Sequence, residues 1–216
     1  MTEEFGTVLP LFSTPIFFPR ETFEVSESLL EFIKSIELNN TDNLRRRQSV
    51  DSYILDREEL SELKQFLEKQ LNVYIQDILQ FKDNEFYITQ SWVSVLFDGE
   101  DHHAHWHQNS LVSGVFYVCG DENPIVLRTI HGDPPFGRSW SFKPSEYNLW
   151  NSGTWSCENK KNTVILFPSI AEHYVGEHSG IGPRMSIAFN SFVQGPVGDV
   201  NTKTELVFND IKAIFR

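Results

Sequence analysis

The sequence predicts a single α+β domain, in which two helices precede a sandwich-like or barrel-like double sheet of short strands. Apolar residues before residue 85 recur mainly at helical spacing, whereas those after it lie in short runs rich in β-branched and aromatic residues. Gly, Pro, Asn and Asp separate these runs, as is typical of strands connected by turns. Because both helices come before the sheet, we expect them to pack on one of its faces.

The N-terminal third is expected to contain an extended opening and two helices. Residues 8–12 and 15–18 combine prolines with aromatic residues, which favour strands over helices. The apolar stripe of residues 26–37 predicts a first helix, and that of residues 57–81 predicts a longer one. Asp56 stands where a residue that caps the second helix is expected.

The remainder is expected to form the sheets and a C-terminal extension. Strands are predicted over residues 86–97, 111–118, 124–129, 163–167 and 184–193. The stretch 132–161, rich in Pro, Ser, Asn and Trp, is predicted to form a loop over the functional site. We therefore divide the single domain 1–216 into supporting elements (1–84), a core (85–195) and an extension (196–216).

Composition excludes several classes of function. The formal charge of −12 argues against binding to bulk nucleic acid or to an anionic membrane. The basic run 45–47 is better explained as a solvated face or helix end than as a phosphate site. Two cysteines, no basic leader and no apolar run of about 20 residues indicate a reducing, cytoplasmic setting. No motif decides the oligomeric state, and a homodimer is compatible with the sequence.

Four of the seven histidines fall within residues 101–107. Residues two apart on a strand face the same side, so His103 with His105, or His105 with His107, can present two imidazoles to one metal ion. His173, which follows a predicted strand and turn, is the candidate third ligand. Imidazole suits iron, zinc, copper and nickel, and the lack of a cysteine pair argues against a structural zinc site. A polar surface segment remains the alternative interpretation.

Further residues surround these histidines in a fixed order. Gly99 precedes His105 by six residues, and the run 105–110 (HWHQNS) leads into 113–117 (SGVFY). Residues 166–169 (LFPS) precede His173, and Arg184 follows it by eleven residues. In this order the chain resembles the 2-oxoglutarate- and iron(II)-dependent oxygenases, and within them a bacterial and phage branch that is prolyl-hydroxylase-like. The resemblance spans roughly residues 91–193, together with residues 11–15 near the N-terminus.

The resemblance implies a double-stranded β-helix, or jelly-roll, core and a dioxygenase activity. Iron(II) would be held by His105, His107 and His173, and the cosubstrates would be 2-oxoglutarate and O₂. Arg184 would bind the far carboxylate of 2-oxoglutarate, with further hydrogen bonds from Ser186, Asn109 and Tyr117. The reaction would hydroxylate a small molecule or a side chain and release succinate and CO₂.

One ligand departs from the pattern that the resemblance implies. The wider family uses two histidines and one carboxylate, and His107 stands where the carboxylate is expected. The one His-x-Asp of the chain, His131-Gly132-Asp133, is a weaker alternative because no Ser-Gly-aromatic strand follows it. A three-histidine cupin-type dioxygenase that needs no 2-oxoglutarate, and a non-catalytic module that binds a metal or small ligand, are the competing hypotheses.

Overall fold

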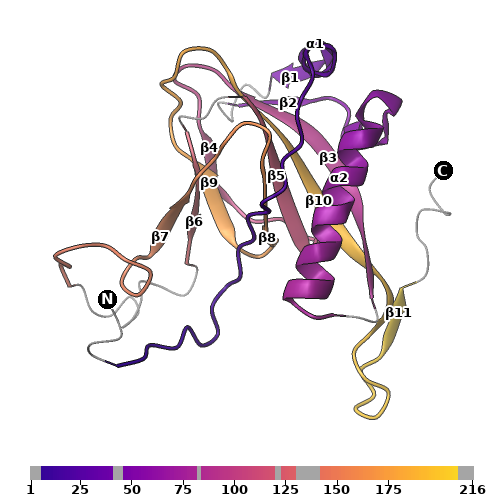
Figure 1. Cartoon of the computed structure of the whole chain (residues 1–216), viewed down its shortest axis with the longest axis vertical. Coiled ribbons are helices and arrows are strands. Elements are labelled where there is room, and N and C mark those ends of the chain that lie inside the picture. The colour runs from indigo at the N-terminus through magenta and orange to yellow at the C-terminus, as the bar shows by residue number, and fades with distance from the viewer. Residues whose placement is uncertain (1–5, 41–45, 82–83, 120–122, 130–141, 209–216) are drawn as a thin grey trace.

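A computed structural model of the chain describes residues 6–40, 46–81, 84–119, 123–129 and 142–208 (Figure 1). Two antiparallel sheets form the domain. The larger has seven strands in the order β1-β2-β3-β10-β5-β8, with β11 paired to β10, and the smaller has the order β4-β9-β6-β7. Their bounds are β1 (Leu38–Asn40), β2 (Arg47–Ser49), β3 (Glu85–Leu96), β4 (His102–His105), β5 (Val112–Cys119), β6 (Ile125–Arg128), β7 (Thr154–Cys157), β8 (Val164–Pro168), β9 (Glu172–Val175), β10 (Arg184–Val197) and β11 (Leu206–Phe208).

The period of two along the strands of the large sheet separates two hydrophobic cores. On β8, Val164 and Leu166 join the core under the helices, whereas Ile165 and Phe167 join the core between the two sheets. On β10, Ile187 and Phe189 face the helices, so the alternate residues of this strand face the space between the sheets. That inner face carries the candidate site.

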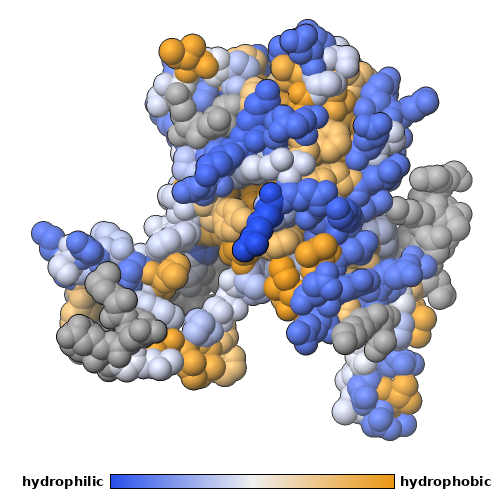
Figure 2. All heavy atoms as spheres, viewed as in Figure 1, coloured by the Kyte–Doolittle hydropathy of each residue, from blue (hydrophilic) through white to orange (hydrophobic). Residues whose placement is uncertain are grey.

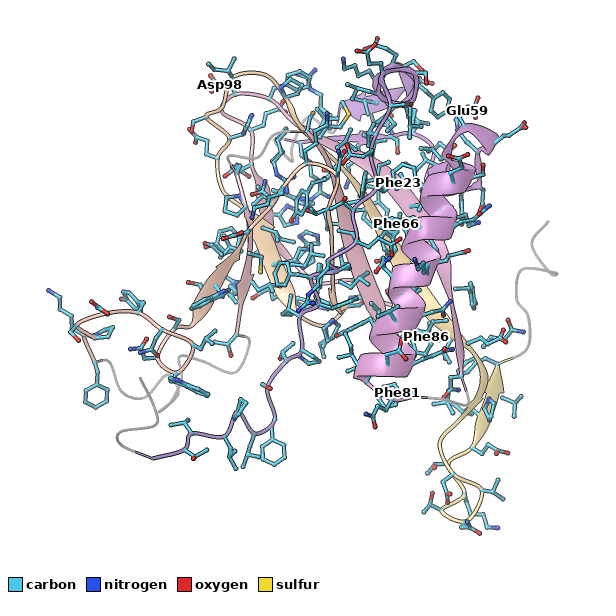
Figure 3. All side chains as sticks on the ribbon, in the orientation of Figure 1. Phe23, Glu59, Phe66, Phe81, Phe86 and Asp98 are labelled. Carbon is cyan, nitrogen blue, oxygen red and sulfur yellow. The ribbon has the colours of Figure 1, made fainter. Side chains whose placement is uncertain are left out.

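The helices cover the outer face of the large sheet, as predicted. Helix α1 (Glu27–Ser35) begins at Ser26, whose hydroxyl accepts a hydrogen bond from the Leu29 N–H at 3.2 Å. Helix α2 (Ser61–Asn72) lies across β3 and β10 in Figure 1 and packs its apolar side into the same core as these strands. Figure 3 shows Phe66 of α2 beside Phe23, with ring centroids 5.6 Å apart. The opposite side of α2 is hydrophilic (Figure 2).

The prediction of one continuous helix over residues 57–81 is wrong in its bounds. Two 3-10 turns, η1 (Ile54–Asp56) and η2 (Glu58–Leu60), come before α2, and a π-helical segment, η3 (Val73–Ile78), follows it. Asp56 does not cap the helix, because its carboxylate binds the Lys64 Nζ at 2.5 Å instead. Leu60 is completely buried, so we attribute these turns to tertiary packing rather than to capping.

The predicted opening strands reduce to a single bridge. Residues 8–12 form no strand, and Phe17 pairs with Leu166 of β8 through hydrogen bonds of 2.8 and 3.0 Å. Prolines at 15 and 19 lack the N–H that a longer ladder needs.

The predicted strands after residue 85 are all present, with ends shifted by no more than four residues. The short strands β4, β7, β9 and β11 were not predicted, and β7 lies inside the stretch 132–161 that was expected to be a loop. None of the helices formed by the described residues has the length and apolarity that crossing a membrane requires.

Candidate metal centre and cosubstrate pocket

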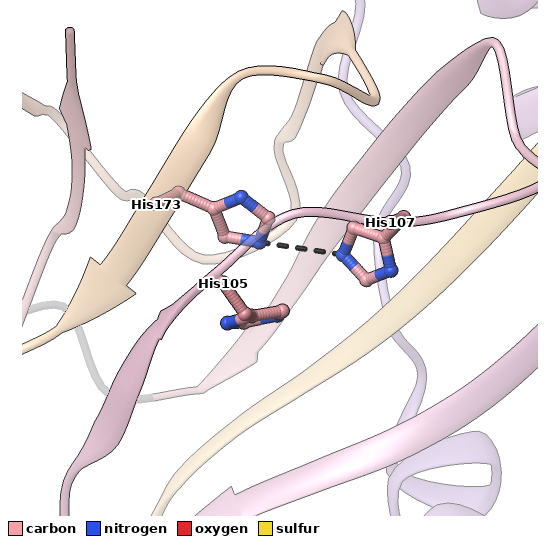
Figure 4. A group of neighbouring side chains, drawn as sticks. All are labelled: His105, His107 and His173. Atoms are coloured by element: carbon pink, nitrogen blue, oxygen red, sulfur yellow. Dashed lines mark hydrogen bonds between the residues drawn. The ribbon is translucent and has the colours of Figure 1, made fainter. Parts of the chain in front are cut away.

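The fold brings His105, His107 and His173 together between the two sheets (Figure 4). His105 ends β4, His107 follows it in the next loop, and His173 lies on β9 directly opposite His105. The candidate ligand nitrogens all lie within 4.8 Å of one another, and the Nε2 atoms of His107 and His173 are 3.3 Å apart. The antiparallel pairing of β4 with β9 thus joins two histidines that are 68 positions apart in the sequence.

Two of the three imidazoles are held in the tautomer that a metal requires. The Nδ1 of His105 lies 2.9 Å from the carbonyl oxygen of His103, and the Nδ1 of His173 lies 3.0 Å from that of Ala171. A carbonyl oxygen can only accept, so each Nδ1 must carry the proton. The Nε2 of both rings therefore carries a lone pair rather than a proton, as in histidines that ligate a metal.

His107 is positioned through its backbone and by a tryptophan. The backbone N–H of His107 donates to the carbonyl oxygen of Ser169 at 3.0 Å, and the ring centroids of His107 and Trp92 are 5.6 Å apart. The hydroxyl of Ser169 in turn hydrogen-bonds those of Ser110 and Ser113 at 2.7 and 2.8 Å. These bonds connect the loop of His107 to the turn that leads into β9, so the positions of His107 and His173 are coupled.

Burial keeps these imidazoles neutral. Desolvation, with a smaller contribution from the neighbouring histidines, lowers the pKa of His173 to about 4 and that of His107 to about 3. Desolvation also lowers the pKa of His105. Neutral imidazole is the metal-binding form, so the three donors are ready for a cation at neutral pH.

The donor set fits a divalent transition metal. With metal–nitrogen bonds of about 2.1 Å, two ligand atoms at right angles are about 3.0 Å apart. The 3.3 Å between His107 and His173 is close to that spacing. Three ligands on one face of an ion leave the opposite face open, as in non-haem iron oxygenases.

A narrow cavity of about 30 Å³ extends from the histidines to Arg184 and Ser186 at the start of β10. Arg184 is 3% exposed, its Nε donates to the Asn123 carbonyl oxygen at 2.9 Å, and its Nη1 lies 3.5 Å from the Ser186 hydroxyl. The Arg184 Cζ also lies 5.5 Å from the centroid of the Tyr117 ring. None of the described residues lining this cavity is acidic, so the Arg184 charge faces a space suited to an anion.

Tyr117 lies next to Arg184, although it does not line the narrow cavity. Its side chain is 1% exposed, and its hydroxyl has no hydrogen-bond acceptor among the described residues. Desolvation raises the pKa of Tyr117, which keeps the phenol neutral. A buried neutral hydroxyl without an acceptor is suited to donate to a carboxylate.

The structure does not place Asn109 with these residues. Asn109 is exposed, adopts a positive φ of 56° in the turn after His107, and does not line the cavity. Its left-handed backbone explains the residue type, since Asn adopts this conformation more readily than most residues. The sequence His131-Gly132-Asp133 lies outside the described residues.

The other histidines divide between the surface and the surroundings of the metal centre. His103 is exposed, whereas His178 is buried and its Nε2 lies 2.8 Å from the Gly182 carbonyl oxygen. His102 is partly buried, stacks on His105 at 4.3 Å between centroids and lines the narrow cavity. Desolvation lowers the pKa of His102 strongly.

Sequence reasoning missed Arg46, which was assigned to a solvated run. Arg46 is partly buried, lies 3.5 Å from the His103 ring through its Nη1, and lines a second cavity that reaches the histidines. Trp92 lines both cavities. No spacing or motif in the sequence distinguishes Arg46 from its neighbours, because the cavity forms only when β2 meets β3.

The comparisons with known proteins agree with this site. Residues 90–190 match the protein family described as "Putative 2OG-Fe(II) oxygenase". No curated protein sequence matches the chain. HygX from Streptomyces hygroscopicus, solved with nickel and 2-oxoglutarate bound, superposes with a TM-score of 0.55 at 10% identity over 82% of each chain.

Two further solved structures share the fold. A Pseudomonas putida prolyl-4-hydroxylase gives a TM-score of 0.52 at 12% identity, over 82% of this chain and 93% of that one. A 2OG-Fe(II) oxygenase-family oxidoreductase from Burkholderia pseudomallei gives 0.51 at 11% identity, over 76% and 78%.

The family match, the fold and the histidine cluster together indicate an oxidoreductase of the non-haem iron class. Within that class, residues 90–190 match the 2-oxoglutarate- and iron(II)-dependent oxygenases, which confirms the resemblance found in the sequence.

Proposed function

We propose that this protein is a 2-oxoglutarate- and iron(II)-dependent dioxygenase that hydroxylates an organic substrate and releases succinate and CO₂. One observation carries the proposal: the three histidines and the buried Arg184 line the same cavity, which no described acidic residue lines. A metal-binding cluster alone would also suit a cupin-type dioxygenase or a binding module. Those alternatives give no reason to bury a cation beside the metal.

His105, His107 and His173 would hold the iron, and Arg184 would form a bidentate pair with the far carboxylate of 2-oxoglutarate. Ser186 and Tyr117 would add hydrogen bonds to the same carboxylate. When bound, iron with 2-oxoglutarate supplies the oxidising chemistry, while the protein orients the cosubstrate and excludes water. The narrow cavity must widen to admit it, so side chains such as Trp92 are expected to move.

The strand orders support a double-stranded β-helix, or jelly-roll, core. Strands β3, β10, β5 and β8 form one sheet of this core, and β4, β9, β6 and β7 form the other. We propose a single domain, in which residues 1–84 support the core of residues 85–195 and residues 196–216 form an extension. We also propose a reducing compartment such as the cytoplasm, because Cys119 and Cys157 form no disulfide.

The third imidazole gives this centre a distinct charge. A carboxylate would cancel one positive charge of iron(II), whereas His107 cancels none, so the centre should attract the dianionic cosubstrate more strongly. The exchange His107→Asp separates this effect from simple loss of a ligand. We expect it to retain iron and to weaken 2-oxoglutarate binding severalfold.

The test is anaerobic titration of the protein with iron(II) and then 2-oxoglutarate, followed by admission of O₂. We expect one iron per chain, a weak visible absorption band when 2-oxoglutarate is added, and succinate once O₂ is present. The variants His105→Ala and His107→Ala should lose iron, and the exposed His103→Ala is the matched control. Absence of both the band and succinate would refute the dioxygenase assignment, and full iron binding by both variants would refute the ligand assignment.

A further inference from the structure

A second cavity, of about 320 Å³, adjoins two of the candidate metal ligands, His105 and His107. His102, His105, His107 and Trp92 line both cavities. Arg184 and Ser186 line only the narrow one, and Arg46, Gln48, Ser49, Ser52, Gln90 and Asn190 line only the wide one. The volume is at the lower end of the range for small-molecule sites, which is about 300–1,000 Å³. His105 and His107 therefore face both cavities, whereas His173 faces only the narrow one.

The wall of the wide cavity is polar throughout. Apart from Trp92 and the histidines, every described lining residue carries a guanidinium, an amide or a hydroxyl group. None of these residues is acidic and none is aliphatic. Such a lining offers little to an apolar substrate, because desolvating it without new hydrogen bonds is unfavourable.

Donors dominate among the groups near the histidines. The indole Nε1–H of Trp92 is buried and has no hydrogen-bond acceptor among the described residues. The Oδ1 of Asn190 already accepts from the Ser113 hydroxyl at 2.9 Å, which leaves the amide N–H groups as that side chain's available donors. Together with the guanidinium of Arg46, whose Nη1 also lies 3.5 Å from the His103 ring, these donors favour a ligand that is rich in acceptors.

We propose that the wide cavity is the substrate site and that it takes a small hydrophilic monocarboxylate, whose carboxylate binds Arg46. This inference rests on the proposed function, since it assigns the narrow cavity to 2-oxoglutarate. A guanidinium pairs with a carboxylate through two parallel hydrogen bonds, which orients the ligand as well as binding it. The rest of the molecule then lies among the amides, with one end towards the histidines where oxidation takes place.

The charge balance favours a carboxylate over a phosphate. Arg46 is the single cation among the described residues of the wall, whereas a phosphate monoester carries up to two negative charges. The chain as a whole carries a formal charge of −12, so its long-range field does not attract anions. Recognition must therefore come from direct contact with Arg46.

The experiment compares ligands that differ only in one charge. Protein loaded with redox-inert nickel(II), with and without 2-oxoglutarate, is titrated with N-acetylserine, N-acetylglutamine and gluconate, and with the neutral carboxamide of each. Inorganic phosphate is a further arm, and binding is measured by calorimetry or ligand-observed NMR. We expect at least one carboxylate to bind about tenfold more tightly than its carboxamide, as for loss of a charge-assisted hydrogen bond.

The variant Arg46→Gln should lose that preference and leave affinity for 2-oxoglutarate within about twofold of the unmodified protein. Arg47→Gln is the matched control, because the Arg47 guanidinium lies 4.2 Å from the Phe97 ring, pairs with Glu100 and does not line the cavity. If Arg46→Gln does not fold, Gln48→Leu alters the same wall without changing charge and should weaken carboxylate binding severalfold.

Three results would overturn the proposal: no carboxylate of the panel binds, carboxamide or phosphate binds as tightly, or neither Arg46→Gln nor Gln48→Leu weakens binding. Failure of the proposed function gives a different pattern, since 2-oxoglutarate would then bind neither the unmodified protein nor Arg47→Gln. Carboxylate binding to the nickel-loaded protein is measured without 2-oxoglutarate, so it can be tested whether or not 2-oxoglutarate binds.

Discussion

Replacing Arg184 with glutamine should change cosubstrate affinity and protein stability independently of each other. Arg184 is 3% exposed, its guanidinium is bound to the Asn123 carbonyl and near the Ser186 hydroxyl, and no described acidic residue lines the cavity that it faces. Burial lowers the pKa of Arg184, because a charge that is removed from water is less stable. Removing it therefore relieves a desolvation cost in the protein without cosubstrate.

With 2-oxoglutarate bound, removing the Arg184 charge is instead unfavourable. Its far carboxylate would lose a bidentate partner inside a dry pocket, and truncating one member of a buried charge pair costs about 2–5 kcal/mol. A value of about 3 kcal/mol corresponds to a rise of roughly 150-fold in the Kd for 2-oxoglutarate. The free energy of unfolding without cosubstrate should fall by no more than about 1 kcal/mol, and it rises if desolvation dominates.

Calorimetry with nickel(II)-loaded protein gives the Kd, and urea unfolding gives the stability. Arg57→Gln, at an exposed ion pair with Asp51, is the control for removing an arginine. If Arg184→Gln binds 2-oxoglutarate within a few-fold of the unmodified protein while its stability falls sharply, Arg184 is a structural residue and the cosubstrate assignment is wrong.

Two further predictions concern packing and pH. Gly114→Ala should reduce the free energy of unfolding by about 1–3 kcal/mol in urea titrations, because a Cβ at this position would collide with the Phe189 ring and with Leu166. Unchanged stability would show that these two side chains can move aside without cost. Metal-free protein should lose stability as the pH falls from 7 to 5, because unfolding frees buried histidines such as His173, with a pKa of about 4, to take up protons near pH 6.5. Each such histidine should lower the free energy of unfolding by roughly 2 kcal/mol between pH 7 and pH 5. Urea unfolding at each pH should show a weaker pH dependence of stability for His173→Asn than for the unmodified protein. A stability of the unmodified protein that does not change with pH would contradict the argument.

The sequence predicted most of the architecture because the patterns involved are local. The two-residue period of β8 and the helical stripe of α2 are visible in the residues themselves, and both elements are present. Helix ends and short strands were missed for a physical reason. Strands such as β4 and β9 have four residues each, and they owe their existence to pairing with each other rather than to propensity.

Part of the candidate site was also predictable from the sequence, and part was decided only by the tertiary structure. The spacing of His105 and His107, and the distance from His173 to Arg184, are properties of the sequence, and the fold places all four around one cavity. The tertiary structure alone decided that Tyr117 lies beside Arg184 while Asn109 turns outward to solvent. It also decided that Arg46, which looks like a surface residue in the sequence, lines the wide cavity. Pairing of distant strands determines which side chains share a space, and no local pattern encodes that pairing.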